Sequence, residues 1–76
     1  MQDPIMTKKE CIELLNQYMA DTYCKGDFEL ADAIKGVIAC LPKFPVTAVI
    51  FLEMCEAEEK YIEYVRCTFK VDRKFV

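Results

Sequence analysis

Cysteines are the most reactive side chains in this 76-residue sequence, and their spacing limits the chemistry they could do. The five stand far apart, with no C-x-x-C pair, at Cys11, Cys24, Cys40, Cys55 and Cys67. Structural zinc sites usually draw ligands from close cysteine pairs, often with histidine, and this chain has no histidine. We therefore expect no metal or other cofactor, and reduced cysteines in an intracellular, cytoplasmic protein. A thiol-based redox or metal-responsive protein that uses some of these cysteines is the alternative function.

Carboxylates offer no clearer chemistry. Glu53, Glu56 and Glu59 recur at every third position and would form an acidic ridge on a helix. Di-iron bundles pair such a glutamate with a histidine three residues later, and the missing histidine is also the commonest general base. The two glycines, Gly26 and Gly36, lie too far apart for a phosphate-binding loop. The sequence predicts no catalytic residue, and we expect that the protein is not an enzyme.

The charges and the length of the uncharged segments argue against nucleic acid and membranes as partners. The chain has 10 Lys and Arg against 13 Asp and Glu, a net charge of −3. Four cations lie near the C-terminus, at Arg66, Lys70, Arg73 and Lys74. A nucleic-acid accessory that uses this basic tail is a third function, although nucleic-acid binding normally needs a wider basic stripe. The longest uncharged run, residues 44–52, is far shorter than the roughly 20 residues that span a bilayer, so no membrane partner is expected.

Two helices are predicted before Pro42. Thr7 followed by Glu10 is typical of a capping box at a helix start, and Gly26 is typical of a helix end. Asp27 is a good N-cap for the second helix, which must end before Pro42. Apolar residues recur at three- and four-residue steps in both segments, as expected for helices that each bury one face. Gly36 lies in the interior of the second helix, where it either permits close approach of another backbone or is tolerated without such a contact.

Residues 46–76 contain neither glycine nor proline, and two structures fit them. The first is one long helix over residues 46–64, followed by an extended tail in which residues 65–71 alternate between apolar and polar. The second is an α+β arrangement with strands near 46–52 and 64–71. Pro45 suits the first turn of a helix and favours the first structure.

The sequence therefore predicts a mainly α fold, a small three-helix domain with an extended C-terminal tail. One helical domain is expected over residues 7–76. Residues 1–6 are expected to be a disordered leader or an addition ahead of the natural start, since Met6 resembles a more natural first residue than Met1.

Apolar composition points to an association surface. Hydrophobic residues make up 54% of the chain, whereas a domain of this size buries only about 60% of the surface that its unfolded chain exposes. The excess should form an exposed patch, and such patches usually mark association sites. We expect a protein–protein interaction module of the regulator, inhibitor or adaptor type, which forms a homodimer or docks to a larger partner. The predicted interaction residues are Ile50, Met54, Tyr61, Tyr64, Val65, Phe69 and Val71.

Overall fold

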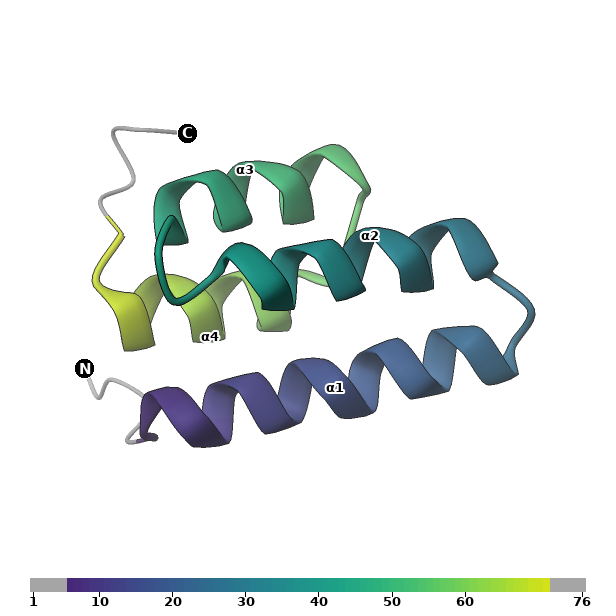
Figure 1. Ribbon diagram of the computed structural model, residues 1–76, viewed down its shortest axis with the longest axis horizontal. Helices are drawn as coiled ribbons and strands as arrows, with labels where there is room; N and C mark the ends of the chain where they lie inside the picture. Colours follow the sequence, from purple (N-terminus) through teal and green to yellow (C-terminus); the bar gives the residue numbers. More distant parts are fainter. Residues whose placement is uncertain (1–5, 72–76) are drawn as a thin grey trace.

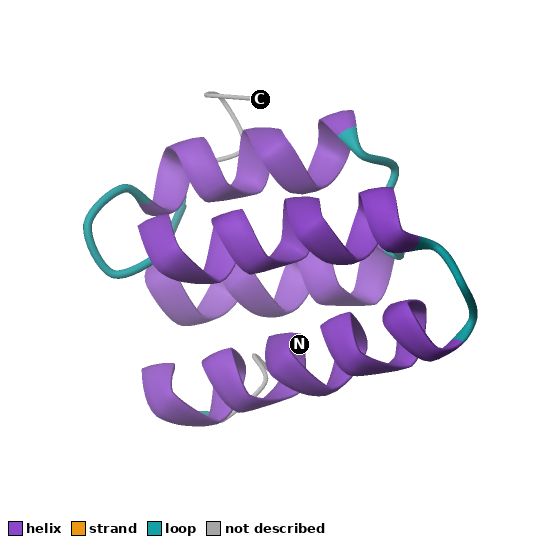
Figure 2. Ribbon diagram, turned by 45° about the vertical axis from the view of Figure 1, so that its right-hand side comes forward, coloured by secondary structure: helices purple, strands orange, loops and turns teal. Residues whose placement is uncertain are grey.

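The computed structural model describes residues 6–71, and these form four α-helices (Figure 1). The helices are α1 (Lys8–Cys24), α2 (Phe28–Cys40), α3 (Pro45–Met54) and α4 (Glu59–Phe69). Each helix packs against the next, and α4 packs back against α1, so the four close into a ring. Helix α2 lies between α1 and α3 on one side of the molecule, as Figures 1 and 2 show. The mainly α class is confirmed, and the predicted count of three helices is wrong.

The predicted boundaries of the first two helices are confirmed by their caps. The Thr7 hydroxyl accepts a hydrogen bond from the Glu10 N–H at 3.1 Å, and the Glu10 carboxylate accepts one from the Thr7 N–H at 2.9 Å. Gly26 ends α1 with a φ of +88°, a conformation that glycine adopts without steric cost. Asp27 then caps α2 by accepting a hydrogen bond from the Leu30 N–H at 3.2 Å. Local sequence thus determines where both helices begin.

The single helix predicted over residues 46–64 is wrong because the chain reverses at Glu56. Glu56 has a φ of 59°, in the left-handed region. Its N–H donates to the Glu53 carbonyl at 3.1 Å, and the Ala57 N–H donates to the Leu52 carbonyl at 2.9 Å. These two bonds form a Schellman motif, which usually contains glycine at the left-handed position. The motif separates α3 from α4 and turns α4 back across the core.

The extended tail and the alternative strands near 46–52 and 64–71 are also wrong. Both segments are helical, and α4 continues to Phe69. The alternation of apolar and polar residues that favoured a strand is misleading at Arg66. This arginine is buried next to buried Val65, so its polar position does not mark a solvent-facing side.

The core draws on all four helices. Met6 packs against this core from the N-terminal side. Residues 1–5 of the predicted leader, and the predicted tail from residue 72 onward, lie outside the described residues. The largest fully buried side chains are Cys11, Leu15, Ile34, Val37, Leu41, Val49, Leu52 and Val65.

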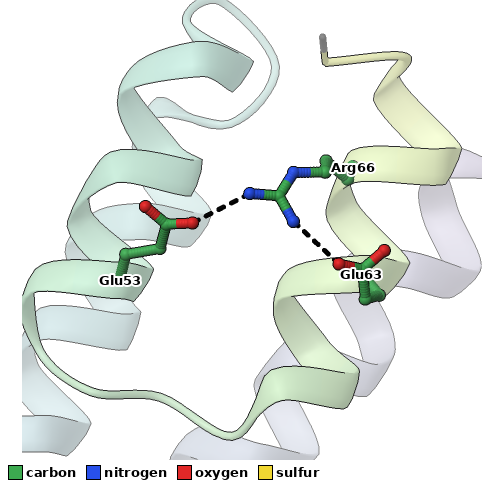
Figure 3. Close-up of polar contacts among 3 residues, drawn as sticks. All are labelled: Glu53, Glu63 and Arg66. Atoms are coloured by element: carbon green, nitrogen blue, oxygen red, sulfur yellow. Dashed lines mark hydrogen bonds and ion pairs between the residues drawn. The ribbon is translucent and has the colours of Figure 1, made fainter. Parts of the chain in front are cut away.

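A buried cation fastens α4 to α3 (Figure 3). The Arg66 side chain is only 8% exposed, and its Nη2 donates to Oε2 of Glu53 on α3 at 2.8 Å. Its Nη1 donates to Oε2 of Glu63, one turn earlier on α4, at 2.7 Å. Burial of a charge is expensive unless the charge is paired, so both carboxylates are needed to hold this guanidinium in place.

Replacement of Glu56 by glycine should stabilise the protein. A residue with a Cβ loses about 1–2 kcal/mol in the left-handed region, and the greater flexibility of glycine in the unfolded chain offsets about 0.5–1 kcal/mol. We therefore expect Glu56→Gly to raise the free energy of unfolding in urea by about 0.5–1 kcal/mol. Glu56→Gln is the matched control, since it removes the charge but keeps the Cβ. A glycine variant no more stable than the glutamine variant would contradict the strained turn.

Removal of the two carboxylates should be more harmful than removal of the arginine. In Glu53→Ala/Glu63→Ala the buried guanidinium keeps neither partner, and we expect a loss of about 3 kcal/mol. In Arg66→Met the apolar stem is kept and both carboxylates can turn to water, so the loss should be about 1 kcal/mol. Urea unfolding of the two variants measures this order, and the reverse order would show that Arg66 contributes mainly through packing.

Candidate interaction surface

The structure divides the predicted interaction residues between two places. Ile50 and Met54 lie one turn apart on α3 and are 37% and 72% exposed. Val65 is fully buried in the core, and Val71 is buried as well. The remaining three are half-buried and pack against the core: Tyr61, Tyr64 and Phe69. One continuous face made of all seven residues therefore does not exist in this fold.

The predicted tyrosine pair belongs to the contact between α4 and α1. The ring of Tyr61 stacks on that of Tyr18 with 4.1 Å between centroids, and the ring of Tyr64 meets Tyr61 edge-on at 5.8 Å. The Tyr18 hydroxyl accepts a hydrogen bond from the Glu58 N–H at 2.9 Å. Burial raises the pKa of Tyr18, and this hydrogen bond offsets only part of the rise. These aromatic rings stabilise the fold, which leaves α3 as the exposed part of the predicted face.

Sequence reasoning missed several exposed aromatic residues. Phe51 is 46% exposed beside Ile50 and Met54 on α3. Tyr23 and Phe28 are 62% and 58% exposed, and their rings meet edge-to-face at 4.9 Å where α1 turns into α2. One signal was available for Phe28: it stands at the first position of α2, ahead of the stripe of Ala31, Ile34 and Val37 that the helix buries.

Two open hollows flank α2, and apolar side chains dominate their walls. The first lies between α2 and α3 and has a volume of about 370 Å³. The second lies between α1 and α2 and has a volume of about 410 Å³. Asp32 lines both. We call the residues that line the two hollows the α2 surface: Met19, Ala20, Tyr23, Cys24, Ala31, Asp32, Ala33, Lys35, Gly36, Phe51, Met54 and Cys55.

The outer side of α2 is open at Gly36, which lines the first hollow. Gly36 is exposed there, and a Cβ built on it would find no other atom within 4 Å. The close backbone approach that would explain this glycine is therefore not made within residues 6–71. Nothing in the packing of the described chain requires glycine at this position.

Few charged residues line the α2 surface: Asp32 lines both hollows and Lys35 lines the second. Residues 27–59, which span α2, α3 and the turns beside them, carry seven Asp and Glu against two Lys. Asp32 is exposed and forms no ion pair within residues 6–71. Burial raises the pKa of the Cys55 thiol, and the nearby carboxylate of Asp27 adds to this rise.

All five cysteines are free thiols in very different surroundings. Cys11 is fully buried, and burial raises its pKa, whereas Cys24 is exposed on the α2 surface. Within residues 6–71, no group of three or more Cys, Asp or Glu side chains is placed to hold a metal ion. The thiols therefore add one exposed nucleophile to the α2 surface.

Comparison with protein-family models, with curated proteins and with solved structures finds no match to this chain. No relative therefore indicates a ligand or a partner, and only the chemistry of the surface itself can point to one. In the described part of the chain, no helix combines the length and the apolar character needed to cross a membrane.

Loss of the Tyr18 hydroxyl should change both stability and its pH dependence. Tyr18→Phe removes the hydrogen bond to Glu58, so we expect a loss of about 1 kcal/mol at neutral pH. Because the pKa of Tyr18 is raised above its ordinary value of 10.0 in the folded protein, the unfolded chain loses this proton first. The stability it contributes is complete below pH 10.0 and declines as the pH rises through the folded pKa.

Urea unfolding between about pH 8 and pH 11 measures this effect. The alkaline decline should be smaller in Tyr18→Phe than in the wild-type protein. Part of it should remain, because the pKa values of Cys11 and Cys55 are raised too. Tyr23→Phe, which removes a hydroxyl from an exposed ring, is the control for the loss of a tyrosine hydroxyl as such. Equal slopes in the wild type and in Tyr18→Phe would contradict the assignment.

Proposed function

We propose that this protein is a small protein-binding module, of the regulator, inhibitor or adaptor kind, that docks to a larger partner through its α2 surface. The observation that supports this proposal is the exposure of large apolar side chains around two open hollows. Met54, Tyr23 and Phe51 are 72%, 62% and 46% exposed, and all three line a hollow. Aromatic residues and methionine are enriched in protein interfaces, where they fill pockets on the partner or form them.

The shape of the hollows favours a protein over a small molecule. Small-molecule sites of about 300–1,000 Å³ bury most of the surface of their ligand. The two hollows lie at the lower end of this range and open directly to solvent. Each can receive a side chain that stays attached to a larger surface. Met19 and Met54, one in each hollow, add flexible thioether side chains that adapt to the shape of an incoming group.

Nucleic acid fits this surface less well, because Lys35 is the one cation that lines it and phosphate binding needs several. One of the four cations that suggested nucleic-acid binding is not available to a phosphate, because Arg66 is buried and paired with Glu53 and Glu63. Lys70 is exposed, while Arg73 and Lys74 lie outside the described residues. The observations therefore favour a protein partner.

Polar substitution on α3 should abolish the interaction and preserve the fold. Phe51→Ser/Met54→Ser changes two exposed side chains, so the free energy of unfolding should change by about 1 kcal/mol or less. Affinity capture from the native cell with quantitative mass spectrometry should identify a protein that the wild type retains and the double variant loses. Light scattering over a range of concentrations reports whether the chain associates with itself.

Phe44→Ser is the matched control, because Phe44 is 59% exposed but lies at the opposite end of α3 and does not line either hollow. It should retain the same protein as the wild type. Equal capture by the wild type and the double variant would contradict the proposed function.

A further inference from the structure

The α2 surface lets another backbone come close. Ala33 and Gly36 lie one turn apart on its outer side, and the space in front of Gly36 is open. Glycine in a helix interior is about 1 kcal/mol less favourable than alanine, and no contact within the described chain compensates for this. Glycine allows close approach of a second backbone, so its position indicates where a bound segment would lie against α2.

The two hollows lie on either side of α2, so side chains of one crossing helix can reach both. They flank α2, whose diameter with side chains is about 10–12 Å. Residues seven positions apart on a helix lie about 10 Å apart along its axis and on the same side. A helix that crosses α2 at Gly36 would therefore place one apolar side chain against Phe51 and Met54 and another against Met19 and Tyr23. Binding of an amphipathic helix in a groove uses such anchors.

The charges select a cationic occupant. Asp32 lies between the hollows, and Glu29, also exposed, lies one turn earlier on α2. Lys35 lines only the second hollow, so two exposed carboxylates, Asp32 and Glu29, are accompanied by one lysine on this side of α2. A second copy of this chain would bring four such carboxylates together with only two lysines, whereas a cationic helix pairs the carboxylates without adding more of them. Lysine or arginine beside the anchors would instead face Asp32.

We propose that the α2 surface binds an amphipathic helix of the partner protein, with apolar anchors seven residues apart in the two hollows and flanking lysine or arginine at Asp32. This inference rests on the proposed function and specifies the chemistry of the partner. The bound helix crosses α2 at Gly36, and its cations lie against the carboxylates of Asp32 and Glu29.

Synthetic peptides of about 18 residues, long enough to form a helix on binding, test the proposal with the full chain. One peptide carries leucine anchors seven residues apart with lysine and arginine on the flanks. A second has the same anchors with glutamate on the flanks, and a third has the composition of the first in scrambled order. By fluorescence anisotropy, the first should bind at least tenfold more tightly than either of the others. Its binding should weaken as salt is added, because salt screens the exposed charges.

Two variants locate the binding site. Gly36→Leu fills the open space in front of α2 and should weaken binding at least tenfold, while thermal unfolding is not lowered because leucine is the better helix former. Asp32→Lys should weaken binding of the cationic peptide at least tenfold and strengthen binding of the acidic one. Glu13→Lys is the matched control: it makes the same change of charge at an exposed position on α1 that lines neither hollow. It should change binding less than threefold.

Several results would overturn the inference. Equal affinity for the cationic and acidic peptides would remove the role of Asp32, and unchanged binding by Gly36→Leu would place the helix elsewhere. A dimer that Gly36→Leu dissociates would identify a second copy as the occupant. The proposed function is tested separately. If no peptide binds while Phe51→Ser/Met54→Ser still loses its captured protein, the protein-binding function is kept and the helical partner is rejected. If that double variant captures the same proteins as the wild type, the proposed function itself fails.

Discussion

The reversal at Glu56 is the constraint on which the rest of the structure depends. A straight continuation of α3 would carry Ile62 and Val65 away from the other helices, and the core would lack one side. The left-handed residue and its two backbone hydrogen bonds instead return α4 against α1 and α3. Ala57, buried directly after the turn, covers the end of the core near Leu52. The strained backbone is therefore held by the apolar surface that it allows to be buried, as expected where tertiary packing outweighs local preference.

The same reversal decides which apolar residues stay exposed. It turns Tyr61 toward Tyr18, where the two rings stack, and the bond between Arg66 and Glu53 holds the returning helix in place. Ile50 and Met54 precede the turn and remain outside. A domain of this size has too little interior for both sets of residues. The exposed face of α3 is thus a consequence of the way the ring closes, and the α2 surface forms where that face meets the side of α2.

Local signals predicted those parts of the fold that depend on neighbouring residues alone. The capping box at Thr7, the cap at Asp27 and the glycine at Gly26 need only residues a turn away, and all three occur in the structure. The turn at Glu56 was hidden because no glycine marks it, and its stability comes from distant contacts in the core. The burial of Arg66 was hidden for a related reason. The partner that allows its charge to be buried, Glu53, lies thirteen positions away in the sequence. The α2 surface could not be found from periodicity, because three helices contribute to it.

Gly36 connects the energetics of the fold with the proposed role of this surface. Small domains have a free energy of unfolding of only about 5–15 kcal/mol. A mid-helix glycine that weakens α2 by about 1 kcal/mol therefore removes a substantial part of it. The space around Gly36 is open, so no contact within the described chain compensates for this loss. Phe51 and Met54 on the neighbouring helix are a second such case, because they are large apolar side chains that the fold leaves exposed. Conflicts between local preference and the isolated fold are expected at functional sites, and here they converge on one side of α2. The proposed helix would resolve both, because it would cover the apolar walls and occupy the space that the glycine leaves.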